Sequence, residues 1–208
     1  MNLTPQQIKT LLGKPLPGIA SHYKMAPTTR KSELEAAQVA KEFAKKSAVM
    51  ILLFHEHENL KVVFIRRSFY VGIHSGQMAF PGGRYEEFDG DVEHTAFREI
   101  EEEIGIAQDN IELLGRISDI YVPASNFLIS VFVGYLAQKP VYKADEREVA
   151  EIIEVDFDDF LKPENIGIKT FFVPSDNHSV EASCYQTTKC DIWGASAMVM
   201  NELVEILC

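Results

Sequence analysis

The chain has 208 residues, of which 46% are hydrophobic and 25% charged, and its formal net charge is −11. This length and composition suit one packed domain with an extension, or at most two small domains, and they exclude collagen-like, low-complexity and disordered proteins. The longest nearly unbroken apolar stretch, residues 127–137, is about half of what a bilayer crossing requires, so we expect no membrane partner.

Two helices are predicted before the first strand. Thr4 and Pro5 form a helix start, with Gln7 completing a capping box, and the helix ends at Gly13. A second helix is predicted over residues 33–46. The first 31 residues lack acids, as transit peptides do, but they contain four prolines and one arginine, and the capping signals favour a folded helix. We interpret residues 1–46 as a helical extension, not an independent domain, and residues 47–208 as the main domain.

From Ala48 onward the hydrophobic pattern changes to that of strands. The strands are predicted at residues 48–54, 60–65, 77–80, 111–120, 127–135, 150–155, 170–173 and 180–185, and the first two form a hairpin. Further helices are predicted at residues 92–104, 156–161 and 195–207. The sum is an α/β protein with a mixed sheet flanked by helices on both sides.

The charge and the cysteines restrict the partners and the compartment. Residues 1–50 carry a net charge of +5 and the remainder carries −16, so we expect no nucleic-acid partner. If the substrate is an anion, divalent cations held by carboxylates would reverse the local field. Cys184, Cys190 and Cys208 are too few for a disulfide framework and lack the spacing of a zinc site, which predicts a cytoplasmic protein.

The helix over residues 92–104 is the informative segment. Between Tyr85 and Glu103 the chain has nine acidic residues and one basic residue. At about 100° per residue, Glu102 and Glu103 lie within roughly 60° on either side of Glu99. Glutamates this close repel one another, which destabilises the helix by a few tenths of a kcal/mol per pair. A bound Mg²⁺ or Mn²⁺ ion would remove this cost, because carboxylate oxygens are ligands that such ions prefer. A solvated face is the commoner explanation of a Glu-rich helix, so charge alone does not decide the matter.

The neighbouring residues add a family resemblance. A Gly82-Gly83 turn precedes the helix, Gly105 ends it, and residues 98–106 read Arg-Glu-Ile-Glu-Glu-Glu-Ile-Gly-Ile. This segment resembles the second half of the Nudix hydrolase signature at every defined position. The first half fits with one inserted residue, which leaves five residues between Gly83 and Asp89 and eight between Asp89 and Arg98.

A narrower resemblance concerns one branch of that family. Residues 65–83 and the run Thr95-Ala96-Phe97-Arg98-Glu99 are similar to motifs of the coenzyme A pyrophosphatase branch, which shares the lengthened spacer. Residues 148–151 and 193–197 are similar to that branch too. Gly72 stands where the branch motif usually has a second arginine. The resemblance covers residues 47–207, so residues 47–208 are interpreted as a Nudix hydrolase domain.

The resemblance implies a Nudix-type α/β/α sandwich and water attack on a diphosphate, with Mg²⁺ or Mn²⁺ as cofactor. It implies that the metal ligands are Glu99, Glu102 and Glu103. The residue that orients or deprotonates the water is one of the helix glutamates, or Glu148 or Glu151. Arg98 is expected to pair with a carboxylate and orient the helix.

The substrate-binding residues implied by the resemblance lie upstream. Gly82 and Gly83 would let the backbone approach metal-bound phosphates. Arg66 and Arg67 are candidates for phosphate recognition, although strand alternation allows only one of them to face the site. For His74 we expect a structural hydrogen bond, and for Trp193 and Tyr185 core packing in preference to stacking on adenine.

The implied reaction is hydrolysis of coenzyme A or its thioesters to 3′,5′-ADP and the corresponding 4′-phosphopantetheine. One alternative is the same chemistry on another nucleoside diphosphate derivative, such as ADP-ribose, NADH or a dinucleoside polyphosphate. The other is a Nudix module that binds nucleotide without cleaving it, which the three retained glutamates disfavour. The family also implies a homodimer.

Overall fold

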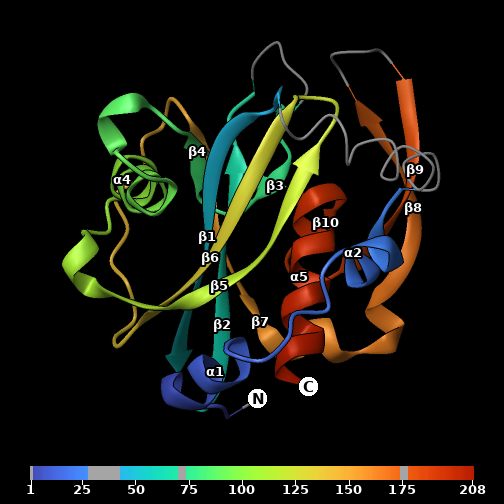
Figure 1. Ribbon diagram of the computed structural model, residues 1–208. Helices are drawn as coiled ribbons and strands as arrows, with labels where there is room; N and C mark the ends of the chain where they lie inside the picture. Colours follow the sequence, from blue (N-terminus) through green and yellow to red (C-terminus); the bar gives the residue numbers. More distant parts are fainter. Residues whose placement is uncertain (1, 28–42, 70–73, 174–177) are drawn as a thin grey trace.

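The computed structural model describes residues 2–27, 43–69, 74–173 and 178–208, and the elements form layers (Figure 1). Helix α4 (Val92–Ile104) covers one face of a central sheet, and helix α5 (Gly194–Leu207) lies on the other. The predicted α/β architecture, with a mixed sheet and helices on both sides, is confirmed. No helix in these described ranges is long and apolar enough to cross a membrane.

The central sheet has the strand order β3-β2-β1-β6-β5, with β4 also paired to β1 and β7 to β2. Strands β1 and β6 are parallel and the other pairs are antiparallel. The β1–β2 hairpin is confirmed and turns at His57, which has φ 58°. The strands are β1 (Lys45–Glu56), β2 (Asn59–Arg67), β3 (Met78–Ala79), β4 (Gly82–Arg84), β5 (Ile111–Val122), β6 (Phe127–Leu136) and β7 (Val149–Asp156).

A second sheet has the order β10-β9-β8 and lies beyond α5 (Figure 1). Its strands are β8 (Ile166–Val173), β9 (His178–Gln186) and β10 (Asp191–Trp193). Strand β8 begins four residues before the predicted residue 170, because Ile166 already pairs with Tyr185. Short 3₁₀ turns occur at η3 (Glu87–Asp89), η4 (Gln108–Asn110), η5 (Phe157–Leu161) and η6 (Pro163–Asn165).

Two apolar clusters hold these layers together. Alternate residues of β1 point to opposite faces, so that Ile51 and Leu53 pack on the α5 side and Leu52 on the α4 side. From α4, the side chains of Ile100 and Ile104 are fully buried against the sheet. This packing fixes which face of α4 turns toward β4.

The N-terminal segment packs into the same body. Helix α1 (Pro5–Leu12) has the predicted capping box at Thr4, and Ile8 is fully buried in the α5-side cluster. Helix α2 (Ile19–Met25) was not predicted, and its His22 lies 2.7 Å from Glu202 of α5. The extent of the N-terminal extension stays a prediction.

The helix predicted over residues 33–46 needs a correction at its end. Residues 33–42 lie outside the described residues. Lys45 and Lys46 begin β1, because they pair with Phe127 and Leu128 at the start of the parallel strand β6. A tertiary strand partner overrides the helical pattern there.

Candidate active site

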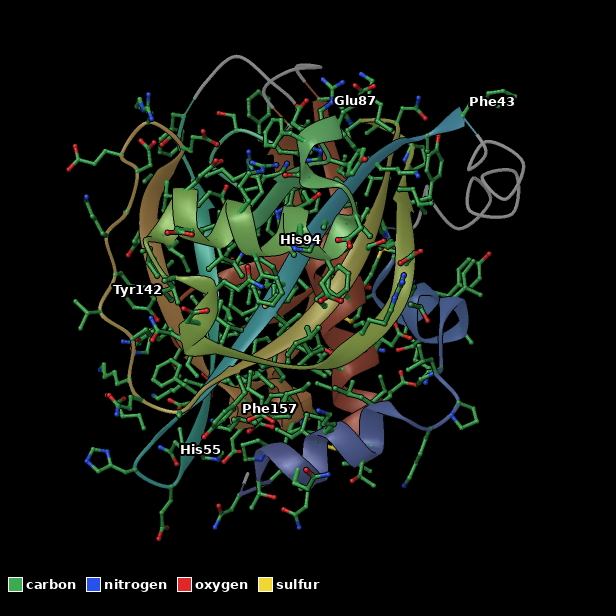
Figure 2. The ribbon with its side chains drawn as sticks, turned by 60° about the vertical axis from the view of Figure 1, so that its left-hand side comes forward. Phe43, His55, Glu87, His94, Tyr142 and Phe157 are labelled. Carbon is green, nitrogen blue, oxygen red and sulfur yellow. The ribbon has the colours of Figure 1, made fainter. Side chains whose placement is uncertain are left out.

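Helix α4 begins and ends where the sequence predicts. The Asp91 carboxylate accepts a hydrogen bond from the His94 backbone N–H at the start, and Gly105 adopts the left-handed conformation at the end, with φ 73°. Figure 2 shows α4 lying across one face of the sheet, with Glu87 at the turn that precedes it. The acidic side of α4 is therefore held against β4.

Glu103 is the most deeply buried of the predicted metal ligands, with 1% of its surface exposed. Its Oε2 accepts a 2.8 Å hydrogen bond from the backbone N–H of Gly82. Its Oε1 has no hydrogen-bond partner and lies 3.8 Å from Nη1 of Arg67. Burial raises the pKa of Glu103 to about 8, and the negative charges of Glu99 and Glu148 act in the same direction.

Glu99 lies against the glycine pair. A Cβ on Gly83 would come within 2.4 Å of the Glu99 carboxylate, so a larger residue there would displace that carboxylate. Gly82 has φ 147°, and a Cβ there would lie 2.2 Å from the backbone oxygen of Ala48 in β1. Burial also raises the pKa of Glu99, against the lowering effect of Arg98. Because they lack a Cβ, the two glycines allow β4 to lie between β1 and the carboxylates of α4.

Arg98 connects the carboxylates to the preceding turn. Its Nε donates a 2.7 Å hydrogen bond to Asp89, and its Nη1 lies 2.8 Å from both Glu99 and Glu102. Asp89 also accepts hydrogen bonds from the Thr95 hydroxyl and the Glu86 backbone N–H. The Arg98 hydrogen bonds are the main reason that the pKa of Asp89 falls to about 2. The lengthened spacer thus places Asp89 where it anchors Arg98.

The structure separates the other predicted residues into two groups. Arg67 lies beside Glu103, and Glu148 is close enough to raise the pKa of both Glu99 and Glu103. Arg66 instead lies 3.1 Å from Glu151, which pairs with it across β2 and β7. Arg67 and Glu148 therefore belong to the same group of charges as the α4 carboxylates, whereas Arg66 and Glu151 form a separate ion pair.

The fit of a divalent cation rests on Glu103. In the described part of the chain no three His, Cys, Asp or Glu side chains are gathered as a ready-made metal site. Yet Glu103 presents a buried oxygen without a hydrogen-bond partner, beside Glu99 and Glu148. Carboxylate oxygens are the ligands that Mg²⁺ and Mn²⁺ prefer. Glu103, together with Glu99 and Glu102, which Arg98 holds near each other, therefore forms the set of carboxylates that would hold such an ion.

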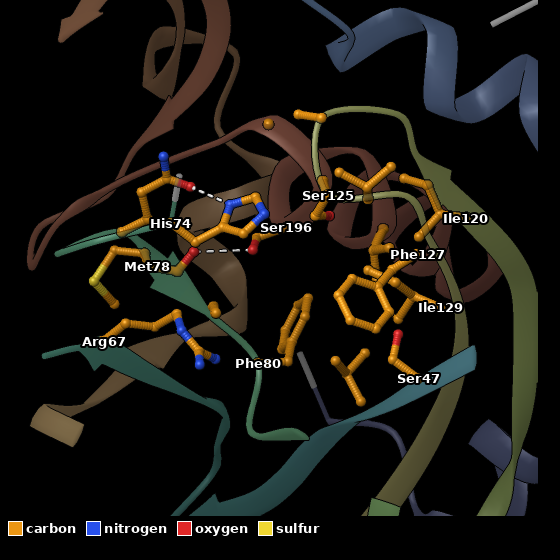
Figure 3. Close-up of a pocket in the computed structure, with 18 of the residues that line it drawn as sticks. Ser47, Arg67, His74, Met78, Phe80, Ile120, Ser125, Phe127, Ile129 and Ser196 are labelled. Carbon is orange, nitrogen blue, oxygen red and sulfur yellow. Dashed lines mark hydrogen bonds between the residues drawn. The ribbon is translucent and has the colours of Figure 1, made fainter. Parts of the chain in front are cut away.

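A pocket of about 590 Å³ is lined by Gly82 and Gly83 on the side away from the α4 carboxylates. Its lining includes these two glycines and Arg67, and its far walls include Phe127 and Val180. Figure 3 shows Arg67 at one side, Phe127 and Ile129 at the opposite side, and Phe80 between them. Sequence reasoning missed these walls, because they come from a β5–β6 turn and a small sheet that carry no motif.

Three aromatic or histidine residues have structural partners. His74 lies 3.1 Å from the Gln77 side-chain oxygen, and Trp193 stacks on Phe171 with ring centroids 4.6 Å apart. Tyr185 is buried and its hydroxyl donates to Asn201. Trp193 also lines the pocket, whereas Tyr185 belongs to the core.

The family model named NUDIX domain matches residues 44–173. The chain is 33% identical over 163 residues to Nudix hydrolase 22 (chloroplastic) of Arabidopsis thaliana, covering 75% of this chain and 53% of that protein. It is 30% identical over 165 residues to the Nudix hydrolase NudL of Pectobacterium atrosepticum, covering 76% and 81%.

The chain belongs to the Nudix hydrolase family. It spans about half the length of the Arabidopsis relative. Among solved structures, the Nudix domain of Shewanella oneidensis NrtR, complexed with ADP ribose, is 19% identical with a TM-score of 0.47, covering 63% of this chain and 86% of that one. The Nudix segment includes β1 to β8 and α4, so the carboxylates and the glycine pair lie within it.

Proposed function

We propose that this Nudix protein hydrolyses coenzyme A or its thioesters to 3′,5′-ADP and 4′-phosphopantetheine or its acyl form, with Mg²⁺ or Mn²⁺. The observation that carries the proposal is the junction at Gly82 and Gly83. On one side these glycines contact Glu103 and Glu99, and on the other they line a pocket with Arg67. A diphosphate at this junction would meet both the carboxylates and a cation.

The metal would be held by Glu99, Glu102 and Glu103. When bound, such an ion supplies charge neutralisation at the diphosphate oxygens and a more acidic water. Glu103 supports this role because its Oε1 is buried without a hydrogen-bond partner. Arg98 already keeps Glu99 and Glu102 close to each other, so it acts as the positioning residue.

The remaining roles follow from the distance between Arg67 and Glu103 and from the effect of the Glu148 charge on Glu99 and Glu103. The Arg67 guanidinium, beside Glu103 and in the pocket lining, would pair with a phosphate oxygen. Glu148, close to Glu99 and Glu103, would orient the attacking water. The water oxygen bonds to one phosphorus of the diphosphate, the bond from that phosphorus to the bridging oxygen breaks, and the proton lost by the water passes to a carboxylate or to solvent. Each product keeps one phosphate of the former diphosphate, and the nucleotide product also keeps its 3′-phosphate. We prefer Glu148 to Glu151 because Glu151 pairs with Arg66.

We also propose a cytoplasmic, reducing location and a homodimer. The three cysteines are free, which supports a reducing compartment. The homodimer is a proposal from the family resemblance. Light scattering at two protein concentrations tests it, and a constant mass of 23.4 kDa would contradict it.

The deciding experiment measures products from coenzyme A, ADP-ribose, NADH and a dinucleoside polyphosphate in parallel. Each substrate is incubated with Mg²⁺, with Mn²⁺ and with EDTA. We expect 3′,5′-ADP from coenzyme A in the presence of metal and none with EDTA. Faster hydrolysis of ADP-ribose, NADH or the polyphosphate would retain the chemistry and reject the coenzyme A assignment. Nucleotide binding without any turnover would reject the enzyme.

A further inference from the structure

We propose that the pocket binds the acylated pantetheine arm of the substrate, so that the protein prefers acyl thioesters of coenzyme A to free coenzyme A. This inference rests on the proposed function, since it concerns the group attached to the diphosphate. It assigns the nucleoside arm to a different part of the surface.

The pocket differs in charge from the rest of the molecule. The chain carries 31 acidic residues, yet none of the described residues that line the pocket is Asp or Glu. Away from Gly83 the walls include apolar side chains from β6 (Phe127 and Ile129), β9 (Val180) and the start of α5 (Val199), and the polar residues among them are uncharged serines and His178. Such a surface gains free energy by covering aliphatic groups.

The two ends of the pocket suit a ligand with an anionic head. Arg67 and Arg84 line it at the end where Gly82 and Gly83 adjoin the α4 carboxylates. The lining is therefore cationic where the diphosphate would lie, and farther away it has no acidic residue and is mainly apolar. An acyl pantetheine phosphate has this same sequence of groups, with phosphate at one end, amides in the middle and an aliphatic chain at the other end.

A nucleobase is a poorer occupant because several of the polar side chains that line the pocket already have partners within the protein. The Ser196 hydroxyl donates a 3.0 Å hydrogen bond to the backbone oxygen of Met78 (Figure 3). His74 is bonded to Gln77 in the same wall. The Trp193 ring stacks on Phe171, at an interplanar angle of 7°, and so has one face covered. A site that recognises the polar edge of a base provides free hydrogen-bond donors and acceptors that match it.

The first test measures binding in EDTA, where hydrolysis does not occur. Isothermal titration compares free coenzyme A with its acetyl, hexanoyl and decanoyl thioesters, and with 3′,5′-ADP alone. Each buried methylene adds up to about 0.8 kcal/mol, which is about fourfold in Kd. We expect Kd to fall at least tenfold from coenzyme A to hexanoyl coenzyme A. Equal affinity along the series would overturn the proposal.

The second test places a charge in the pocket. Val180→Asp puts a carboxylate on the pocket face of β9, whereas Ile168→Asp puts one on the opposite, outer face of the same sheet, where Ile168 is 65% exposed. We expect Val180→Asp to weaken hexanoyl coenzyme A at least tenfold and to leave 3′,5′-ADP unchanged. Ile168→Asp should change neither. Weaker binding of 3′,5′-ADP by Val180→Asp alone would place the nucleoside in the pocket and reject the inference.

Two controls keep the result interpretable. If Val180→Asp does not fold, Val180→Trp fills the same space without a charge and should also remove the dependence on chain length. Metal-dependent hydrolysis of coenzyme A, together with a Kd that does not depend on the length of the acyl chain, would reject this inference and retain the proposed function. Dependence on chain length in binding, without metal-dependent hydrolysis of any thioester, would reject the proposed function and retain the pocket.

Discussion

Gly83 lies so close to Glu99 that a single added Cβ would come within 2.4 Å of the carboxylate. The contact joins the residue that ends the Gly-Gly turn to the first glutamate of the α4 motif. In the family resemblance, both positions belong to one signature but are sixteen residues apart. The structure gives a physical reason for the spacing, since β4 must pass directly under the acidic side of α4.

Gly83→Ala should therefore lower activity more than stability. The atoms that the new Cβ meets are the end of a flexible side chain, which moves at little cost and takes the carboxylate away from the site. We expect kcat to fall roughly 10²-fold, as for other disturbed metal-site geometry. Gly82→Ala is the matched control, because its Cβ meets the Ala48 backbone at φ 147° and should destabilise the fold by about 2 kcal/mol. Thermal melting and initial rates separate the two effects, and an unchanged rate in Gly83→Ala would contradict the assignment of Glu99.

Glu103→Gln tests the central ligand through both activity and pH dependence. We expect kcat to fall by roughly 10²–10³-fold, because a charge that acts on the reacting groups is removed. In metal-free wild-type protein the pKa of Glu103 rises from 4.5 to about 8 on folding, so the free energy of unfolding falls as pH rises through that interval.

The variant has no carboxyl to ionise at this position. Metal-free Glu103→Gln should therefore gain stability relative to wild type between pH 5 and 8, as measured by urea unfolding at several pH values. A near wild-type rate with normal metal dependence would reject Glu103 as a ligand. If the difference in free energy of unfolding between Glu103→Gln and wild type does not change with pH, the raised pKa of Glu103 is contradicted.

Local signals made much of the fold predictable. The bounds of α4 follow from Asp91, Gly105 and the apolar positions between them, and the capping box at Thr4 gave α1. Helix α2 has no side-chain cap and was not predicted, and two strands could not be found from local signals either. Strand β4 consists of Gly82–Arg84 and depends on pairing with β1, and β10 has three residues paired with β9. Short strands acquire their structure from partners distant in sequence.

The candidate site was predictable in its residue types but not in its grouping. Strand alternation showed that Arg66 and Arg67 could not both face the site, but it did not show which one does. That choice depends on the register of β2 with β7, which shifts between Arg66 and Arg67. The pocket walls were not predictable, because Phe127 and Val180 come together only through the packing of two sheets.

Asp89→Asn should loosen the positioning of the α4 carboxylates. The Asp89 side chain is 2% exposed and binds Arg98 through two of its nitrogens, so we expect about 2 kcal/mol of lost stability and a 10- to 100-fold fall in kcat. The pKa of Asp89 falls from 3.8 to about 2 on folding, so its contribution is full above pH 4 and is lost as pH falls toward 2.

Asp119→Asn is the surface control for this change. Asp119 pairs with Arg116 at 2.6 Å, but the Arg116 side chain is 52% exposed, so the pair is worth about 0–1 kcal/mol. Acid unfolding followed by circular dichroism should show a smaller loss of stability between pH 4 and 2 for Asp89→Asn than for wild type. Asp119→Asn should follow wild type, and an equal effect of both substitutions would contradict a special role for Asp89.

Arg67→Gln and Arg66→Gln form the sharpest pair for substrate recognition, because they are neighbours on β2 with different partners. Arg67 lies 3.8 Å from Glu103 and lines the pocket, whereas Arg66 lies 3.1 Å from Glu151. A charged hydrogen bond to phosphate is worth about 1.5–3 kcal/mol, so Arg67→Gln should lower kcat/KM by roughly 10- to 100-fold. Arg66→Gln should change kcat/KM less than threefold, since it removes a half-exposed ion pair.

Rates on coenzyme A and on 3′-dephospho-coenzyme A then show which phosphate Arg67 contacts. Loss of activity on both substrates in Arg67→Gln indicates contact with the diphosphate, and loss on coenzyme A alone indicates contact with the 3′-phosphate. A larger effect of Arg66→Gln than of Arg67→Gln would contradict the placement of the diphosphate beside Gly82 and Gly83.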